Sequence, residues 1–419
     1  MANGTDDKLP LWLKEILDNG NLVERYTLLD EHTSFAQINK LSEQITFYSS
    51  LSKLAKLKPN KKKIAFFRDG PFLSNDITTG AIVSLLGEMD ALADEGYEVY
   101  VFYCFRGWSD PELYKNQKFT TVFIKPKDFY SNSQLLRSII LNFGISICQF
   151  DSAEAVYLQA DLVRPEAKIV FEVHNVEYDL LSQLKGKPSE ISYIKNKERI
   201  AMSASDLILV RSEQDSLLLQ KLKKTKFNIH IFRGCINTDR IHFLKRSRTY
   251  KKVLFLGHLN YSPNIQAVDL ICNKIAPKVD AHFIIIGAGS ERLKKKYKNS
   301  NVSFLGYVNN LNAIFSQVDI GIAPIITGSG TRLKILDYMA SGMPVIGTSR
   351  SIEGLEKKIH ETMVVEDKIE KYPKLIDELL KNQAIRKLYS KKGHEYVSKY
   401  RNWKNCIGDI ITAYKTLFS

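Results

Sequence analysis

A glycine-rich turn that opens a predicted helix is the most chemically informative stretch of the chain. It lies in the segment PIITGSGTRLKILDYMASG, which begins at Pro324. A strand-like run, DIGIAPI, precedes the turn, and TRLKILDYMAS has the apolar spacing of a helix. The first backbone N–H groups of a helix have no partner within it, and the helix dipole is positive at that end. Gly328 and Gly330 let an anion approach the backbone closely, so the turn is a candidate phosphate site.

The predicted helix carries its polar groups on one face. Thr331, Lys334, Asp337 and Tyr338 fall together at helical spacing, and the leucines fall on the opposite face, which should pack on a sheet. A hydroxyl and an ammonium near the helix start suit a diphosphate. A carboxylate one turn later can accept hydrogen bonds from both hydroxyls of a ribose. Many α/β proteins also have a strand, a glycine turn and a helix in this order, so a purely structural turn is the alternative.

The elements that position this turn alternate between strands and amphipathic helices from Lys63 onward, which predicts parallel sheets with right-handed crossovers. A polar linker at 245–252 separates a first series of strands from a second. The predicted strands are KIAFF (63–67), YEVYVFYCF (97–105), ISICQF (145–150), KIVFEVH (168–174), DLILVRS (206–212), NIHIF (228–232), KVLFLGHL (252–259), AHFIIIGAG (281–289), VSFLGYV (302–308), DIGIAPI and MPVIGTS. We therefore expect an α/β protein of two Rossmann-like, doubly wound domains, with ligands in the cleft between them, beyond the carboxyl ends of the strands.

Four segments follow from this pattern. We expect a helical N-terminal extension at 1–62, a first Rossmann-like domain at 63–244, a second at 245–395, and a C-terminal helix at 396–419. The extension is expected to be helical because 9–17, 32–37 and 40–57 are amphipathic. Two roles remain open for it: a cap on the first domain, or a helix that binds a membrane surface or a partner.

The charge balance is strongly basic. The 419 residues carry a formal net charge of +14, which attracts polyanions such as nucleic acid, an anionic membrane or phosphorylated substrates. A solvated lysine surface is the simpler reading. No zinc finger, RNP-like strand or arginine-rich arm is present, so no nucleic-acid partner is expected. The basic run Lys53–Lys63 makes an anionic membrane surface the candidate to test.

Compartment signals favour a cytoplasmic protein, with peripheral attachment to the membrane left open. No run approaches the roughly 18 apolar residues that would span a bilayer. The N-terminus lacks the basic region and cleavage site of a signal peptide. The five cysteines are scattered, without a CxxC pair, so we expect reduced, buried thiols in place of disulfides or a zinc site.

Several segments in one order resemble the retaining glycosyltransferases of family 4 (group 1), which have the GT-B fold. The strongest is GSGTRLKILDYMASGMPVIGT; VLFLGHLNYSPNIQAV, HFIIIGAG and FLGYV resemble the same family at the expected spacing. FEVHNVEYDLL and DLILVRSEQD resemble its acceptor-side segments, and WKNCIGDIITAYKTLF its last helix, which crosses back to the N-terminal domain. The resemblance covers the chain from about Lys63 to the end.

By matching position, the resemblance implies roles for individual residues. The turn and helix start should hold the donor diphosphate, Asp337 should hold the ribose in place of the usual glutamate, and the FLGYV loop should meet the base. His174 should face the transferred sugar as a catalytic residue together with Lys334, and Gly80 should lie in the acceptor-side loop. The donor-binding set is Gly306, Tyr307, Val308, Gly328, Ser329, Gly330, Thr331, Arg332, Lys334 and Asp337.

Two departures from the family pattern affect the donor site. Many members have a pair of glutamates eight positions apart, and Ser329 stands where the first would be. We interpret this as a change in how the sugar is gripped. The usual Arg and Lys after the VLFLG strand are also absent, and His258 or Arg233 are the candidates to replace them.

The resemblance implies a hexosyl- or N-acetylhexosaminyltransferase that takes a sugar from a nucleotide-sugar, UDP- in preference to GDP-, and passes it to a sugar, lipid-linked or protein acceptor with retention. No cofactor is expected, and no metal, because the chain has no Asp-x-Asp motif. Glu177 and Asp179, near His174, are explained equally well as a solvated loop. Other GT-B enzymes, such as an epimerase or a phosphorylase, and a catalytically silent glycan-binding subunit remain alternatives.

Overall fold

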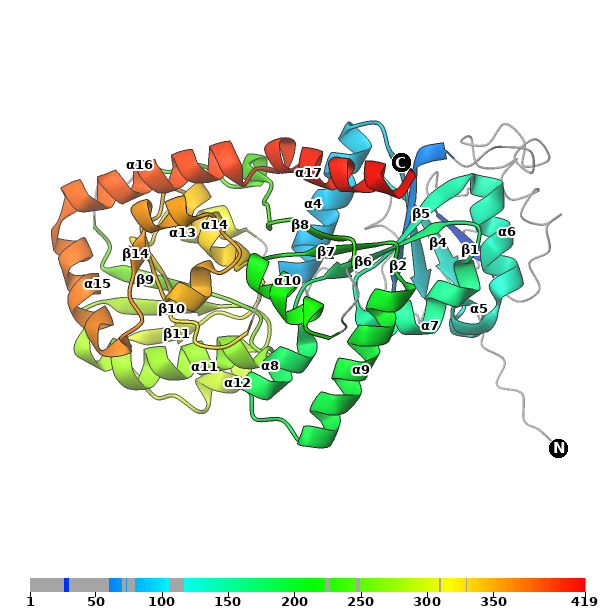
Figure 1. The fold of residues 1–419 in the computed structure, drawn as a ribbon. Coiled ribbons are helices and arrows are strands. Elements are labelled where there is room, and N and C mark those ends of the chain that lie inside the picture. Colours follow the sequence, from blue (N-terminus) through cyan, green and yellow to red (C-terminus); the bar gives the residue numbers. More distant parts are fainter. Residues whose placement is uncertain are drawn as a thin grey trace. The chain divides into compact units, whose positions relative to one another are not determined.

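A computed structural model describes residues 26–29, 60–69, 73, 80–104, 117–222, 227–245, 249–308, 310–328 and 330–418. The strands form two parallel sheets with helices between successive strands, which confirms the predicted α/β class (Figure 1). The first sheet has eight strands in the order β1-β4-β3-β2-β5-β6-β7-β8. They are β1 (Tyr26–Leu29), β2 (Asn60–Arg68), β3 (Glu98–Cys104), β4 (Thr120–Ile124), β5 (Ile145–Phe150), β6 (Lys168–Val173), β7 (Leu207–Val210) and β8 (Ile229–Ile231).

The second sheet has six strands in the order β11-β10-β9-β12-β13-β14. They are β9 (Lys252–Leu256), β10 (His282–Ile286), β11 (Val302–Phe304), β12 (Ile320–Ala323), β13 (Val345–Gly347) and β14 (Val364–Val365). Counted along the chain, this is the 3-2-1-4-5-6 order of dinucleotide-binding sheets, in which the winding direction reverses between the first and fourth strands. Here these are β9 and β12, which pair in parallel.

Helices connect the strands of both sheets. Around the second sheet, Figure 1 shows α13, α14 and α16 on one face and α11 and α12 on the other. The α-helices are α4 (Gly80–Asp94), α5 (Pro126–Ser131), α6 (Ser133–Phe143), α7 (Ala153–Val163), α8 (Glu177–Gln183), α9 (Pro188–Ala204), α10 (Glu213–Gln220), α11 (Ser262–Leu270), α12 (Ser290–Lys294), α13 (Leu311–Phe315), α14 (Leu333–Ala340), α15 (Tyr372–Lys381), α16 (Gln383–Tyr400) and α17 (Trp403–Lys415).

By compactness the chain divides into two units: 1–74, 92–151 and 155–170 form one, and 75–91, 152–154 and 171–419 form the other. Within the second unit, the predicted last helix is α17, and it packs on α4. The Trp403 indole lies against Gly87, and the Tyr414 hydroxyl donates to Glu88 Oε1 at 3.4 Å. The second unit therefore contains the second sheet, the end of the first sheet and the helices that join them.

Three expectations about elements need correction. The segment 1–62, expected to be helical, contains β1 and the start of β2; YTLL is too short to show a period, and its pairing with β4 could not be read locally. The helices expected at 9–17, 32–37 and 40–57 lie outside the described residues. The helix expected to begin at Thr331 begins at Leu333, and the strands β4 and β14 were not predicted.

The cysteine prediction was also wrong in part. Cys235 and Cys406 form a disulfide, with their Cα atoms 6.6 Å apart. Backbone hydrogen bonds join the same two segments, since Ile236 N–H donates to the Arg401 carbonyl at 2.9 Å. The partners are 171 residues apart, so spacing could not reveal the pair. The other three cysteines are free and buried, as expected.

Candidate functional site

The loops after β9 and β12 define the first place to look for a site. In an open α/β sheet, ligands bind beyond the carboxyl ends of the strands where the winding direction reverses. The strand β9 ends at Leu256 and leads into Gly257, and β12 ends at Ala323 and leads into the GSGT turn. The sheet order thus brings the glycine-rich turn to the position where this architecture binds ligands.

The turn depends on glycine at the two described positions. Gly328 and Gly330 have φ values of +91° and +77°, a backbone conformation that side chains other than glycine rarely adopt. A methyl group on Gly330 would lie 2.5 Å from the carbonyl oxygen of His174. Ser329 lies outside the described residues. The turn therefore approaches the backbone that follows β6, within the second unit.

Side chains hold the turn in this shape. The Gly328 N–H donates to Gln183 Oε1 at 2.8 Å, and the Arg332 guanidinium donates to the Gly330 carbonyl at 3.0 Å. Burial lowers the pKa of Arg332 below its ordinary value. Arg332 therefore stabilises the turn by binding the Gly330 carbonyl. The Gly328 N–H, one of the predicted phosphate-binding groups, already has an amide oxygen as its acceptor.

Thr331 has a structural contact as well as a predicted ligand role. Its Oγ1 accepts a hydrogen bond from the Gly234 N–H at 3.2 Å. A methyl group on Gly234 would lie 2.9 Å from Thr331 Cβ, so the two segments are closely packed. The segment after β8 and the start of α14 are therefore fixed to one another.

Lys334 and Asp337 lie one turn apart on α14, and burial dominates the electrostatics of both. Lys334 Nζ donates to Asn264 Oδ1 at 2.7 Å and lies 4.2 Å from the centre of the Phe255 ring. Burial, followed by repulsion from Arg332, holds the pKa of Lys334 well below its ordinary value. Burial raises the pKa of Asp337 to about 7, although Lys334 opposes that rise. The cost of desolvation is thus the main cause of the pKa shift of both groups.

Tyr338 does not share this polar face, contrary to the helical-wheel prediction. Its ring is fully buried against Gly321, and its hydroxyl accepts the Leu256 N–H at 2.6 Å. Of the leucines expected on the opposite face, Leu336 is buried in the core and Leu333 is partly buried against it. A tyrosine is long enough to reach past the helix to β9, so its position on the wheel did not indicate where its ring packs.

His174 directly follows β6 and is held by charged neighbours. Its Nδ1 lies 3.3 Å from Arg211 Nη2, and its Nε2 lies 3.8 Å from Glu172 Oε1. The His174 side chain is 17% exposed, but its Nε2 atom is buried. Since its carbonyl oxygen faces Gly330, the structure brings His174 and the glycine-rich turn together.

Two backbone groups of the FLGYV loop are already hydrogen-bonded to other parts of the protein. The Gly306 N–H donates to Ser290 Oγ at 2.7 Å, and the Gly306 carbonyl accepts the Gly287 N–H at 2.8 Å. Gly306 was predicted to offer these groups to a base, but both are hydrogen-bonded to the segment that follows β10. Tyr307 and Val308, which are half-buried, remain the predicted positions for that contact.

Gly80 is the exposed first residue of α4 and lies beside the start of α14. A methyl group on Gly80 would be 4.0 Å from Leu333 Cδ1, an ordinary contact distance. Of the two candidates to replace the missing cations, Arg233 is paired with Glu213. Burial, and next Arg292, lower the pKa of the other, His258, which favours its neutral form.

Sequence reasoning missed three side chains that organise the site: Gln183, Asn264 and Arg211. Asn264 is the most fully connected of them, because its amide accepts from Lys334 and donates to the His258 carbonyl at 2.9 Å. Only its place in the family-like run NYSPN marked it. Among the residues that the structure describes, no group of three or more His, Cys, Asp or Glu side chains is arranged to hold a metal ion.

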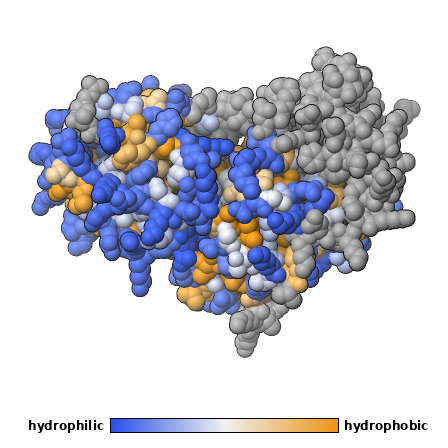
Figure 2. Space-filling model, turned by 90° about the horizontal axis from the view of Figure 1, so that it is seen from above, coloured by the Kyte–Doolittle hydropathy of each residue, from blue (hydrophilic) through white to orange (hydrophobic). Residues whose placement is uncertain are grey.

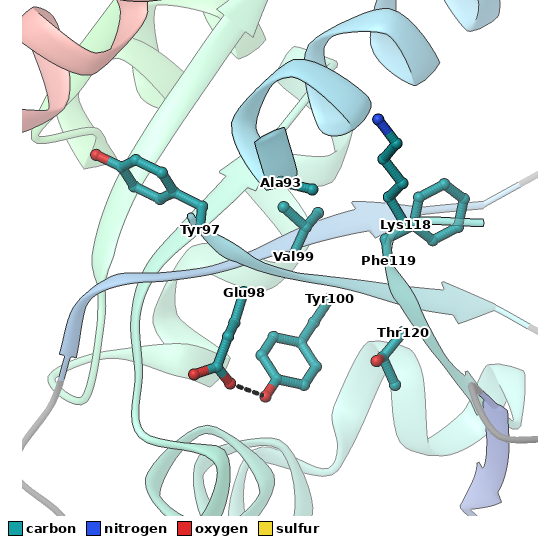
Figure 3. A pocket seen from close by; sticks show the side chains of 8 residues that line it. All are labelled: Ala93, Tyr97, Glu98, Val99, Tyr100, Lys118, Phe119 and Thr120. Atoms are coloured by element: carbon teal, nitrogen blue, oxygen red, sulfur yellow. Dashed lines mark hydrogen bonds between the residues drawn. The ribbon is translucent and has the colours of Figure 1, made fainter. Parts of the chain in front are cut away.

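A cavity of about 250 Å³ lies in the first unit (Figure 3). It is lined by the first residues of β3 and β4, and Glu98 accepts a hydrogen bond from the Tyr100 hydroxyl at 3.0 Å. Lys63 forms an ion pair with the same carboxylate at 2.8 Å. These are the amino ends of the strands, the opposite edge from that at which open α/β sheets bind ligands. We therefore assign the candidate site to the second unit.

Comparisons with known proteins concern the fold and the family. Among solved structures, sucrose-phosphate synthase from Thermosynechococcus elongatus has a TM-score of 0.68 and 16% identity, covering 85% of this chain and 99% of that chain. Anabaena HepE in complex with UDP and glucose has a TM-score of 0.64 and 11% identity, covering 85% of this chain and all of that one (100%). Identities this low establish the fold alone. The fold is GT-B, as predicted.

The family comes from sequence. Residues 250–382 match the family model described as glycosyl transferases group 1, which confirms the predicted family for this part of the chain. An uncharacterized 44.6 kDa protein in the cps region of Klebsiella pneumoniae is 24% identical over 61% of this chain and 63% of its own length. An uncharacterized glycosyltransferase of Methanocaldococcus jannaschii is 27% identical over 39% of this chain and 45% of its own length. The chain thus spans less than two thirds of both relatives.

Proposed function

We propose that this protein is a retaining glycosyltransferase that moves a hexosyl or N-acetylhexosaminyl group from a nucleotide-sugar to an acceptor hydroxyl. The observation that carries the proposal is the arrangement at the reversal point of the second sheet. There a positive-φ glycine turn precedes α14, and the half-buried Lys334 and Asp337 follow on its polar face. An anion-binding turn, an ammonium group and an acceptor for the ribose hydroxyls thus follow one another in the order that a nucleoside diphosphate requires.

In the proposed reaction, breaking the glycosidic bond places negative charge on the leaving diphosphate. Lys334 and the N-terminal backbone of α14 stabilise that charge. Gly328, Gly330 and Thr331 lie around the diphosphate in this scheme. The acceptor oxygen bonds to the anomeric carbon on the face from which the phosphate leaves, and the departing phosphate oxygen takes the acceptor proton. His174 orients the sugar, and its carbonyl oxygen faces the developing positive charge.

The finer assignments belong to the same proposal. Asp337 accepts from the ribose hydroxyls, Tyr307 and Val308 meet the base, and Gly80 lies on the acceptor side. The domains are proposed to divide at 62, 244 and 395. UDP is the proposed nucleotide, because a relative in fold, Anabaena HepE, is described with UDP and glucose. A role in assembling a glycan or glycolipid is suggested by the Klebsiella relative, named for its cps region.

A donor screen tests the activity. Purified protein is incubated with UDP- and GDP-linked hexoses and N-acetylhexosamines, and release of the nucleotide is followed by chromatography. We expect slow hydrolysis of one UDP-sugar, accelerated by an extract that contains the acceptor, and a product whose anomeric configuration matches the donor by NMR. Failure to release nucleotide from every donor, with or without the extract, would point to a binding subunit.

We further propose that the protein works at the cytoplasmic membrane face on a lipid-linked acceptor, held there by charge. No helix in the described part of the chain is long and apolar enough to cross a bilayer. Hydrophilic residues dominate much of the described surface in Figure 2. The basic run 53–63 is described only from residue 60 onward. Vesicle co-sedimentation at low and high salt tests the idea: electrostatic docking requires binding to anionic vesicles alone, with release at high salt.

A further inference from the structure

A buried ion pair lies beneath His174. Glu172, the penultimate residue of β6, is 0% exposed, and Arg211, which follows β7, is 4% exposed. The two side chains form a salt bridge between neighbouring strands of the sheet. Arg211 also donates to Ser84 Oγ at 3.4 Å, and its guanidinium lies 4.8 Å from the Phe232 ring centre. The guanidinium is therefore fixed from several sides.

The geometry around the imidazole specifies its protonation pattern. Arg211 Nη2 is 3.3 Å from His174 Nδ1, and a guanidinium can only donate hydrogen bonds. Nδ1 must then be the acceptor, so the neutral ring carries its proton on Nε2. A protonated ring would direct a second N–H at the Arg211 cation, while the charge of Glu172 is already shared with Arg211. Glu172 and Arg211 both lie against the ring, and Arg211 in turn donates to Ser84.

The backbone at His174 is fixed as well. A methyl group on Gly330 would lie 2.5 Å from the His174 carbonyl, so the glycine turn restrains the main chain while Arg211 restrains the ring. With both ends held, the direction of the Nε2–H bond depends on Arg211. Nε2 is itself buried and lies 3.8 Å from Glu172 Oε1, so its N–H lies on the side of the buried ion pair.

We propose that Arg211 is a positioning residue, which holds His174 as the neutral Nε2–H tautomer and so fixes this residue beside the glycine turn. The consequence for sugar transfer rests on the proposed function, whereas the tautomer does not. Glu172 serves as the counter-charge that allows Arg211 to be buried. Arg211 itself acts through His174 and touches no reacting atom in this scheme.

The test compares wild-type protein with three variants. Glu172→Gln keeps Arg211 as a donor to Nδ1, since an amide oxygen can still accept from the guanidinium. The double variant Glu172→Gln, Arg211→Met removes the donor without leaving a buried unpaired carboxylate, the costly outcome of a single Arg211 deletion. Arg211→Lys keeps a cation for Glu172 but provides only one compact ammonium. Thermal unfolding confirms that each protein is folded before it is compared.

The first readout is the ring ¹⁵N spectrum of ligand-free protein labelled at histidine. The His174 signals are identified by their loss in His174→Asn. We expect an unprotonated Nδ1 and a protonated Nε2 in the wild type and in Glu172→Gln, and averaged signals from exchanging tautomers in the double variant. A proton on Nδ1 in the wild type would overturn the proposal, as would an unchanged spectrum in the double variant.

The second readout is turnover with the donor that the screen identifies. Relative to Glu172→Gln, we expect the double variant to lose about 10–100-fold in kcat, with the donor KM changed less than about 3-fold, because misdirecting a group at the reacting centre costs rate more than binding. Arg211→Lys should fall between them. Equal kcat in the double and single variants would also overturn the proposal. If no donor is turned over by any protein, the spectrum alone decides on Arg211, and it is the proposed transferase activity that fails.

Discussion

Replacing Asp337 by asparagine should stabilise the fold while it weakens nucleotide binding. In the folded protein, burial raises the pKa of Asp337 from its ordinary 3.8 to about 7. That difference of about 3 pH units corresponds to roughly 4 kcal/mol at 1.36 kcal/mol per unit, an upper limit for the cost of keeping the carboxylate charged. Asparagine removes this cost but deprives Lys334 of its counter-charge, so we expect a net gain of about 1–2 kcal/mol.

The sign of the pH dependence follows from the raised pKa. Between pH 3.8 and about 7 the folded protein holds a proton that the unfolded chain has lost, so the contribution of Asp337 to stability falls as pH rises through this window. Above pH 7 the carboxylate is charged in both the folded and the unfolded state, and the full cost of burying that charge remains. The gain from Asp337→Asn should therefore be largest at pH 8 and should disappear near pH 4, where both residues are neutral.

Nucleotide binding should change in the opposite direction. A charged hydrogen bond is worth about 1.5–3 kcal/mol, so losing the carboxylate should raise the Kd for UDP roughly 10–100-fold. For the wild type, affinity should also decline as pH falls below 7, because the protonated carboxyl is a weaker acceptor.

The assay is thermal unfolding at pH 8 and pH 5, together with calorimetric titration of UDP at pH 8. The gain should appear as a rise of about 2–8 °C in Tm at pH 8. Asp280→Asn is the control, because it removes an exposed carboxylate of the same unit whose only described ion pair is with Lys251 at the surface. A variant that is less stable than the wild type at pH 8, or that binds UDP equally well, would refute the assignment of Asp337.

Three further predictions concern the same site. Lys334→Ala should lower kcat about 100-fold or more with a small change in Tm, because its charge acts on the leaving diphosphate; a collapsed Tm with normal activity of the remaining folded protein would make the lysine structural. Gly330→Ala should cost roughly 1–2 kcal/mol from its positive φ alone and abolish UDP binding by pushing against the His174 carbonyl, whereas Gly80→Ala, 4.0 Å from Leu333, should unfold at the wild-type temperature. EDTA should leave nucleotide release unchanged in the donor assay, and a complete loss restored by metal would mean that the donor site is wrongly assigned.

The parts of the fold that could be read from the sequence are those with local signals. The strand β10 and the helix α14 are marked by apolar runs and periodicity, and glycines mark the positive-φ positions 328 and 330. The β1–β4 pairing and the Cys235–Cys406 disulfide join segments that are far apart, and no local pattern records them. Sequence reasoning proposed the candidate site from its turn and missed Gln183, Asn264 and Arg211, which contact the turn, Lys334 and His174 from other elements.

Tyr338 shows why a correct helix does not yield a correct face. Its Cα lies where the wheel predicted, but the side chain reaches the backbone of β9 and accepts the Leu256 N–H. The polar face of α14 is therefore narrower than the wheel suggested, with Lys334 and Asp337 as its charged members. Burial lowers the pKa of Lys334 well below its ordinary value and raises that of Asp337 to about 7, shifts that composition alone could not indicate.

The hydrogen bonds already made at the glycine turn determine how strongly it can favour a diphosphate. An anion site is usually inferred from N–H groups that have no partner within the helix. Here the Gly328 N–H donates to Gln183 Oε1, and Lys334 Nζ donates to Asn264 Oδ1. When a diphosphate binds at this turn, its oxygens have to replace these amide oxygens as acceptors. Each new contact therefore contributes only the difference in free energy between a charged and a neutral hydrogen bond. Selectivity for a doubly charged diphosphate over weaker acceptors follows, because only a stronger acceptor than an amide gains from the exchange.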